Sequence, residues 1–208
     1  MSLHEEDNRA KHSDFNRDDD NGNHPVLNRS WAEVNLDQLA ANVRLIRRSV
    51  HRACEIMGVV KADAYGHGVL QVAPVMLANG VSRLAVSMLD EAIELRLAGI
   101  EVPILVLGFT DPRRAREILN YRITQTVYSR DLAQALSDAA VSLSCEARIH
   151  IKVDTGMGRV GFLAGYQAVK EITWIRDLPG IVIEGMYTHF ATADEEDVRF
   201  VWQQFEQF

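Results

Sequence analysis

The chain has 208 residues, of which 47% are apolar and 25% are charged, and its formal net charge is −7. These fractions are typical of a soluble globular protein, and the longest apolar run, Val102 to Phe109, is far shorter than the roughly 18 residues of a membrane helix. The acidic balance argues against a nucleic-acid partner, which would need a clustered basic face. No secretory signal is visible, and Cys54 and Cys145 form no disulfide framework, so we expect a cytoplasmic protein without a membrane partner.

The first 28 residues differ in composition from the rest. They hold seven acidic residues against three basic ones, and only six apolar side chains. Such a segment cannot bury enough apolar surface to offset the entropy lost on ordering. We therefore predict a disordered acidic tail over residues 1–28 and a globular domain over residues 29–208.

Beyond the tail, strand-like and helical patterns alternate. Residues 31–35 resemble a strand, and apolar residues then recur at helical spacing from Leu36 to Ile46. Further strands are predicted near residues 57, 85, 105, 125, 150 and 183. Further helices are predicted over residues 70–78, 90–98, from 111, over 129–136 and 166–176, and from Asp194.

This alternation predicts a parallel α/β sheet, because helical crossovers join parallel strands and cover them. An open doubly wound sheet and a (β/α)8 barrel are both compatible with the pattern. A closed barrel needs eight strands and typically about 250 residues, whereas six strands follow the opening one here. We expect a partial (β/α)8 barrel, with an exposed sheet edge if it ends after six strands.

The first candidate for chemistry is Lys61, which ends the apolar run Ile56–Val60. A lysine that leaves a buried strand is partly desolvated, and its amine can attack carbonyls, although it can also simply extend into solvent. Residues Tyr65–Gly68 then predict a tight loop with a hydroxyl and exposed N–H groups suited to a phosphate. A lysine beside such a loop indicates pyridoxal phosphate.

The second candidate is the strand His150–Asp154 and the loop after it. Alternation places His150, Lys152 and Asp154 on one face, which is costly unless that face borders a polar site. Three glycines then spell G-x-G-x-x-G over residues 156–161, a pattern also found in dinucleotide-binding loops. Because Arg159 lies inside it, we favour a bent backbone that directs this guanidinium toward a carboxylate.

The third candidate is His189, which follows the last predicted strand. In a barrel it would lie at the same edge as Lys61 and Arg159. A lone histidine is more often a structural hydrogen-bond partner than a catalyst. A metal site that combines His150 with His189 lacks ligand spacing, so we expect no metal.

Together, three segments resemble the family of bacterial alanine racemases, in order and spacing as well as in sequence. They are Val-Val-Lys-Ala-Asp-Ala-Tyr-Gly-His-Gly at 59–68, Lys-Val-Asp-Thr-Gly-Met-Gly-Arg-Val-Gly-Phe at 152–162 and Gly-Met-Tyr-Thr-His-Phe-Ala-Thr-Ala-Asp at 185–194. The resemblance covers residues 30–208, and Asp63 stands where many members carry Asn. It implies interconversion of L-alanine and D-alanine with pyridoxal 5'-phosphate, for D-alanine supply to peptidoglycan.

On the cofactor side, the resemblance implies that Lys61 binds pyridoxal phosphate covalently. The same lysine would remove or return the α-proton on the D-alanine side. Tyr65 would help to hold the cofactor phosphate, and His189 would lie behind the cofactor ring.

On the substrate side, the resemblance implies that Arg159 binds the alanine carboxylate close to the phenolic oxygen of the cofactor. Lys152 matches a lysine that is often carbamylated in the family and that positions this arginine. Met157 would line the substrate site.

Family members continue through the last barrel strands into a C-terminal β domain, which supplies the second base across a homodimer interface. The resemblance assigns these groups to no residue here, so we expect a truncated form that is unstable or inactive alone. Two alternatives stay open. One is a non-catalytic pyridoxal phosphate-binding homeostasis protein, and the other is a related decarboxylase or broad-specificity amino-acid racemase.

Overall fold

The computed structural model describes residues 32–208, so the predicted acidic tail over residues 1–28 lies outside the described part. Residues Val34–Phe208 form one compact unit. The described part of the predicted strand at 31–35 contains no strand, so that prediction is wrong there. Instead, the Asn35 side chain accepts a hydrogen bond from the backbone N–H of Gln38 at 2.8 Å and caps the first helix.

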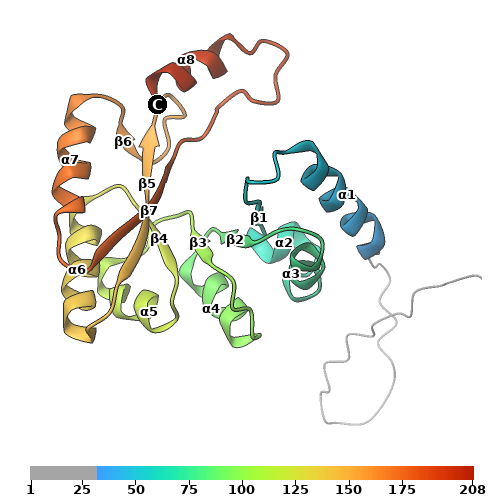
Figure 1. The fold of residues 1–208 in the computed structure, drawn as a ribbon, viewed down its shortest axis with the longest axis horizontal. Helices are drawn as coiled ribbons and strands as arrows, with labels where there is room; N and C mark the ends of the chain where they lie inside the picture. Colours follow the sequence, from blue (N-terminus) through green and yellow to red (C-terminus); the bar gives the residue numbers. More distant parts are fainter. Residues whose placement is uncertain (1–31) are drawn as a thin grey trace, which may run out of the picture. The chain divides into compact units, whose positions relative to one another are not determined.

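Six parallel strands in residues 32–208 form the main sheet, in the order β1-β2-β3-β4-β5-β7, and a short strand, β6, pairs with the end of β5 (Figure 1). The bounds are β1 Met57–Val59, β2 Arg83–Val86, β3 Ile104–Val106, β4 Thr124–Val127, β5 Ala147–Asp154, β6 Phe162–Leu163 and β7 Ile181–Tyr187. The six strands predicted from apolar runs are therefore confirmed. The two residues of β6 are too few to show any alternation, so no strand was predicted there.

The helices connect these strands in turn. Their bounds are α1 Leu36–Ser49, α2 Lys61–Gly66, α3 Val69–Ala78, α4 Leu89–Leu97, the 3-10 helix η1 Pro112–Arg114, α5 Ala115–Asn120, α6 Arg130–Leu143, α7 Tyr166–Arg176 and α8 Arg199–Gln207. Two boundaries differ from the predictions by more than one residue. Helix α6 continues seven residues beyond Leu136, and the last helix begins at Arg199 instead of Asp194.

The two faces of the sheet differ in polarity. Ile149 and Ile151 of β5 are fully buried in one apolar cluster with residues of α6 and α7, whereas Lys152 and His150 lie against the ring of Tyr187 on β7. Figure 1 shows α4, α5, α6 and α7 along the same side of the strands. A doubly wound sheet would carry helices on both faces, so this arrangement favours the barrel type of sheet, with its polar face turned inward.

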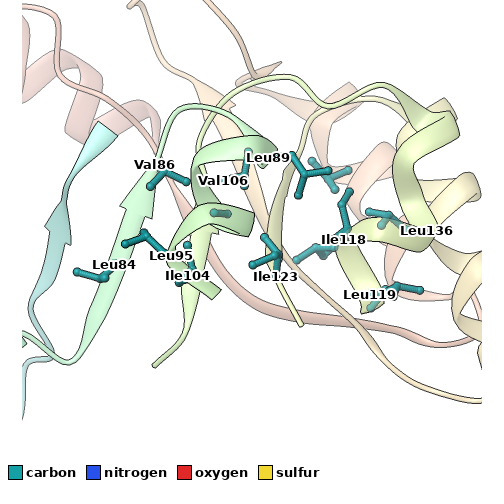
Figure 2. Close-up of a cluster of buried hydrophobic side chains, with 14 of the residues drawn as sticks. Leu84, Val86, Leu89, Leu95, Ile104, Val106, Ile118, Leu119, Ile123 and Leu136 are labelled. Atoms are coloured by element: carbon teal, nitrogen blue, oxygen red, sulfur yellow. The ribbon is translucent and has the colours of Figure 1, made fainter. Parts of the chain in front are cut away.

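The core lies between the sheet and these helices. Leu84, Leu95, Ile104, Ile118 and Leu136 are each at most 1% exposed and come from β2, α4, β3, α5 and α6 (Figure 2). Truncating one such side chain to Ala typically costs about 2–5 kcal/mol. The core thus fixes the strand ends on which the candidate site is built.

A β-bulge interrupts the pairing of β5 with β7. Ile149 pairs with Ile183, but the next residue, His150, pairs with Gly185, so Glu184 is the extra residue. A Cβ on Gly185 would lie only 2.9 Å from the His150 ring, which explains a glycine at this position.

Candidate active site

The residue after β1 begins an unusual turn. Ala62, Asp63, Ala64 and Tyr65 all have φ between 51° and 58°, so four consecutive non-glycine residues of α2 form a left-handed turn. Each such residue costs about 1–2 kcal/mol relative to right-handed backbone. The sequence predicted a tight loop at Tyr65–Gly68, but the strained turn begins earlier, directly after Lys61.

Hydrogen bonds hold this turn in place. The backbone N–H of Ala64 donates to the carbonyl of Val60 at 2.9 Å, and the Asp63 carboxylate accepts from the N–H of Val69 at 2.7 Å. Lys61 is half-buried, and its Nζ lies 5.8 Å from the ring centroid of Tyr65, which is itself exposed. An amine and a phenol therefore project together from the carboxyl end of β1.

The polar face of β5 holds a buried amine. Lys152 is 2% exposed, and its Nζ donates to the carbonyl of Val153 at 3.1 Å and lies 5.4 Å from the Tyr187 ring centroid. Burial lowers the pKa of Lys152, and the positive charge of Arg159 lowers it further, while Asp154 opposes the shift. The Tyr187 hydroxyl is also within hydrogen-bond distance of the Thr126 hydroxyl, at 3.0 Å.

Asp154 organises the glycine loop that carries Arg159. One of its carboxylate oxygens accepts from the N–H groups of Gly156 at 2.9 Å and Gly158 at 3.1 Å. Burial alone would raise the pKa of Asp154, but these hydrogen bonds and the Lys152 charge outweigh burial and hold it below its ordinary value. In a dinucleotide-binding loop such N–H groups would face pyrophosphate, so their use by Asp154 argues against that alternative.

Glycine is required in this loop for space as well as for conformation. Gly161 has φ +138°, and a Cβ there would lie 2.6 Å from the backbone nitrogen of Asp154. Arg159 is exposed at the tip of the loop, and Met157 is half-buried beside it. The bent backbone expected from the sequence is thus present.

His189 lies where the charged groups converge. Burial lowers the pKa of His189, and the positive charges of Arg159, Lys152 and Lys61 lower it further. The ends of β1, β5 and β7 therefore bring the four residues to one edge of the sheet. Such a concentration of positive charge suits an anionic ligand.

Two residues of this edge escaped the sequence predictions. Gln204 of α8 is fully buried, donates to the carbonyl of His189 at 3.0 Å and to the Thr155 hydroxyl at 3.2 Å, and accepts from the N–H of Ala191 at 2.8 Å. Glu91 of α4 accepts from the N–H of Ala62 at 2.6 Å. Both come from elements distant in sequence from the motifs, so local patterns gave no signal for them.

Among residues 32–208, no group of three or more His, Cys, Asp or Glu side chains could hold a metal ion. Among the same residues, no helix combines the length and apolar character needed to cross a membrane.

Comparisons with known proteins agree on one class, α/β barrel-type racemase domains. The family model for the alanine racemase N-terminal domain matches residues 34–208. The chain is 49% identical over 178 residues to an alanine racemase of Clostridium tetani, a match that covers 86% of this chain and 46% of the relative. The chain therefore belongs to the alanine racemase family, and residues 34–208 correspond to the N-terminal domain of that family.

Solved structures give the same result. An alanine racemase of Clostridium difficile 630 superposes with a TM-score of 0.83 and 43% identity, over 85% of this chain and 46% of the other. A histidine racemase of Leuconostoc mesenteroides superposes with a TM-score of 0.78 and 33% identity, over 83% and 46% of the two chains. The chain thus spans slightly less than half the length of the relatives it matches.

Proposed function

We propose that this chain provides the cofactor lysine and the carboxylate-binding arginine of a pyridoxal phosphate-dependent alanine racemase. The observation that carries the proposal is that Lys61 follows β1, Arg159 follows β5 and His189 follows β7, at the carboxyl ends of parallel strands of one sheet. The positive charges of Arg159, Lys152 and Lys61 also lower the pKa of His189. An amino acid and pyridoxal phosphate bring a carboxylate and a phosphate into one site, and these charges suit both groups. The phenol of Tyr65, beside Lys61, is available to the phosphate.

On the cofactor side, the Lys61 amine would attach to the cofactor aldehyde, Tyr65 would donate to a phosphate oxygen, and His189 would lie behind the ring. Bound pyridoxal phosphate supplies an electron sink that makes the substrate Cα–H acidic. Lys61 would then move the proton at Cα on one face of the substrate. No residue in 32–208 is assigned to the opposite face, so the activity proposed is that of the whole protein.

On the substrate side, Arg159 would grip the carboxylate through two parallel N–H bonds, with Met157 lining the site. Lys152 would act from behind Arg159. Burial lowers its pKa, which favours the neutral amine that reacts with CO2. The amine would lose a proton and form a carbamate, whose oxygens could accept from Arg159.

We propose a cytoplasmic homodimer that supplies D-alanine for peptidoglycan, with the second proton-transfer group coming from the rest of the assembly. The 208-residue chain alone should therefore not racemise alanine at ordinary enzyme rates.

The cofactor assignment is tested by trapping. The purified chain is mixed with pyridoxal phosphate and reduced with borohydride, and its peptides are mapped by mass. The label should appear on Lys61 and vanish in Lys61→Arg, while the exposed Lys170 of α7 reports background labelling in both proteins. A wild-type chain labelled no more at Lys61 than at Lys170 would contradict the proposal.

One observation supports a second substrate, since a structural relative at 33% identity is a histidine racemase. The whole protein containing this segment should be assayed with L-alanine and L-histidine. We expect alanine to be preferred, and faster turnover of histidine would transfer the assignment to that amino acid.

A further inference from the structure

Glu91 joins the turn after β1 to the turn after β2. Its Oε1 accepts from the N–H of Ala62 at 2.6 Å, and its Oε2 accepts from the N–H groups of Ser87 at 2.7 Å and Met88 at 2.8 Å. The carboxylate therefore satisfies three backbone donors from two neighbouring strand ends. It lies just beyond the last backbone link between those strands, in which Val60 donates to the carbonyl of Ala85 at 2.8 Å.

The contact with Ala62 bears directly on Lys61. The N–H of Ala62 belongs to the peptide unit that follows the Lys61 Cα, so its direction fixes the backbone torsion ψ of Lys61. At this point the chain leaves Val60, with φ −123°, and enters the left-handed run that begins at Ala62. A residue with φ near +50° is strained unless its surroundings hold it, and Glu91 provides such a constraint from another element.

We propose that Glu91 is a positioning residue for Lys61. It would set the direction in which the lysine amine leaves the strand, and so the rate at which that amine condenses with the cofactor aldehyde. The inference rests on the proposed function in that it takes Lys61 as the cofactor lysine. Glu91 itself would touch neither cofactor nor substrate.

The carboxylate is suited to this role by its two equivalent acceptors. In Glu91→Gln one oxygen becomes an amide group, which can only donate, so either Ala62 or the Ser87–Met88 turn would face a donor. In Glu91→Asp both acceptors remain, but the side chain is one methylene shorter. Asp should therefore restore part of the effect that Gln removes.

The test compares the wild-type chain with Glu91→Gln, Glu91→Asp and a control, Glu94→Gln. Glu94 is an exposed carboxylate on the same helix, so Glu94→Gln removes the same charge from the same helix as Glu91→Gln. Each protein is treated with limiting pyridoxal phosphate and borohydride, and labelling of Lys61 is divided by that of Lys170 in the same molecule. Amide hydrogen exchange of residues 57–66 is followed in parallel.

In Glu91→Gln the Lys61-to-Lys170 ratio should fall about tenfold, since small displacements of a reacting group are costly in rate. The segment 57–66 should exchange faster, Asp should lie between Gln and wild type, and Glu94→Gln should match wild type. A Gln variant with a wild-type ratio, or an equal loss of labelling at Lys170, would overturn the inference.

Failure of the proposed function gives a different result, because Lys61 of the wild-type chain would then stay unlabelled. In that case hydrogen exchange of residues 57–66 tests whether Glu91 positions the turn. Faster exchange of residues 57–66 in Glu91→Gln than in Glu94→Gln would support it, and equal exchange would refute it.

Discussion

The loops after β1 and β5 both leave ordinary backbone geometry, but they are built in different ways. The β1 loop places four non-glycine residues, Ala62–Tyr65, in left-handed conformations, and its Ala62 N–H donates a hydrogen bond to Glu91, 29 positions away. The β5 loop uses glycines and the carboxylate of Asp154, the residue at its own start. One strained segment thus depends on a distant element and the other largely on its own sequence.

This difference explains why the two loops differ in how visible they are in the sequence. Glycines and a nearby aspartate form a recognisable motif. Glycine adopts positive φ at little cost, and aspartate accepts hydrogen bonds from nearby backbone N–H groups. Alanine, aspartate and tyrosine give no such signal for a left-handed turn. When a residue outside the loop stabilises its strained backbone, the loop's own sequence does not show it.

The largest expected effect comes from breaking the self-contained loop with Gly161→Ala. The new Cβ would meet backbone atoms of Val153 and Asp154 at 2.9 Å and 2.6 Å, and φ is +138°. We expect a loss of about 2–4 kcal/mol in the free energy of unfolding, measured by urea denaturation. The matched control is Gly165→Ala, where φ is +133° but nothing lies within 4 Å, so only the conformational cost of about 1 kcal/mol should remain. Equal losses in both variants would show that the close approach to Asp154 is unimportant.

A smaller effect is expected when the internal carboxylate is neutralised in Asp154→Asn. The pKa of Asp154 lies below its ordinary value of 3.8, so its stabilising contribution is complete above that value and is lost as the pH falls through the lower folded-state pKa. The variant should lose about 1–2 kcal/mol at neutral pH and show a shallower loss of stability on acidification. Urea unfolding at a series of pH values measures both. Asp138→Asn, on the exposed side of α6, should leave the wild-type profile in place.

The smallest effect is expected in the loop after β1. In Ala62→Gly the left-handed conformation loses its steric cost while the N–H that donates to Glu91 stays, so stability should rise by about 0.5 kcal/mol. The same change in a right-handed helix, Ala41→Gly in α1, should lower it by about 1 kcal/mol. Thermal denaturation of the two variants gives the comparison. A loss in both would mean that the turn after Lys61 is not left-handed in solution.

The sequence was sufficient for the six strands of the main sheet. Buried parallel strands are short apolar runs between turn residues, and all six predicted runs form strands. The predicted strand at 31–35 was wrong over its described part because Asn35, whose side chain suits a helix cap, begins α1. The late start of α8 at Arg199 had no clear signal, since acidic residues from Asp194 onward resemble a helical first turn.

The candidate site was predictable only in part. Lys61, Arg159 and His189 follow apolar strands and Lys152 lies near the end of one, and parallel topology brings such positions to one edge. Glu91 and Gln204 depend on tertiary contacts between elements far apart in sequence. No local period or motif encodes those contacts.

The extra residue in β7 has a consequence for how charge is sorted along the sheet. Glu184 and Tyr187 are three positions apart, an odd separation that in a regular strand would send them to opposite sides. The bulge corrects this parity, so Glu184 meets Arg148 at 2.6 Å while Tyr187 meets Thr126, both on the inward side. One inserted residue thereby divides the inward side of the strand into a part that forms an ion pair and a part that lies beside a buried amine. Deletion of the extra residue, Glu184, would leave the pairing of His150 with Gly185 in place and would remove the carboxylate that Arg148 meets.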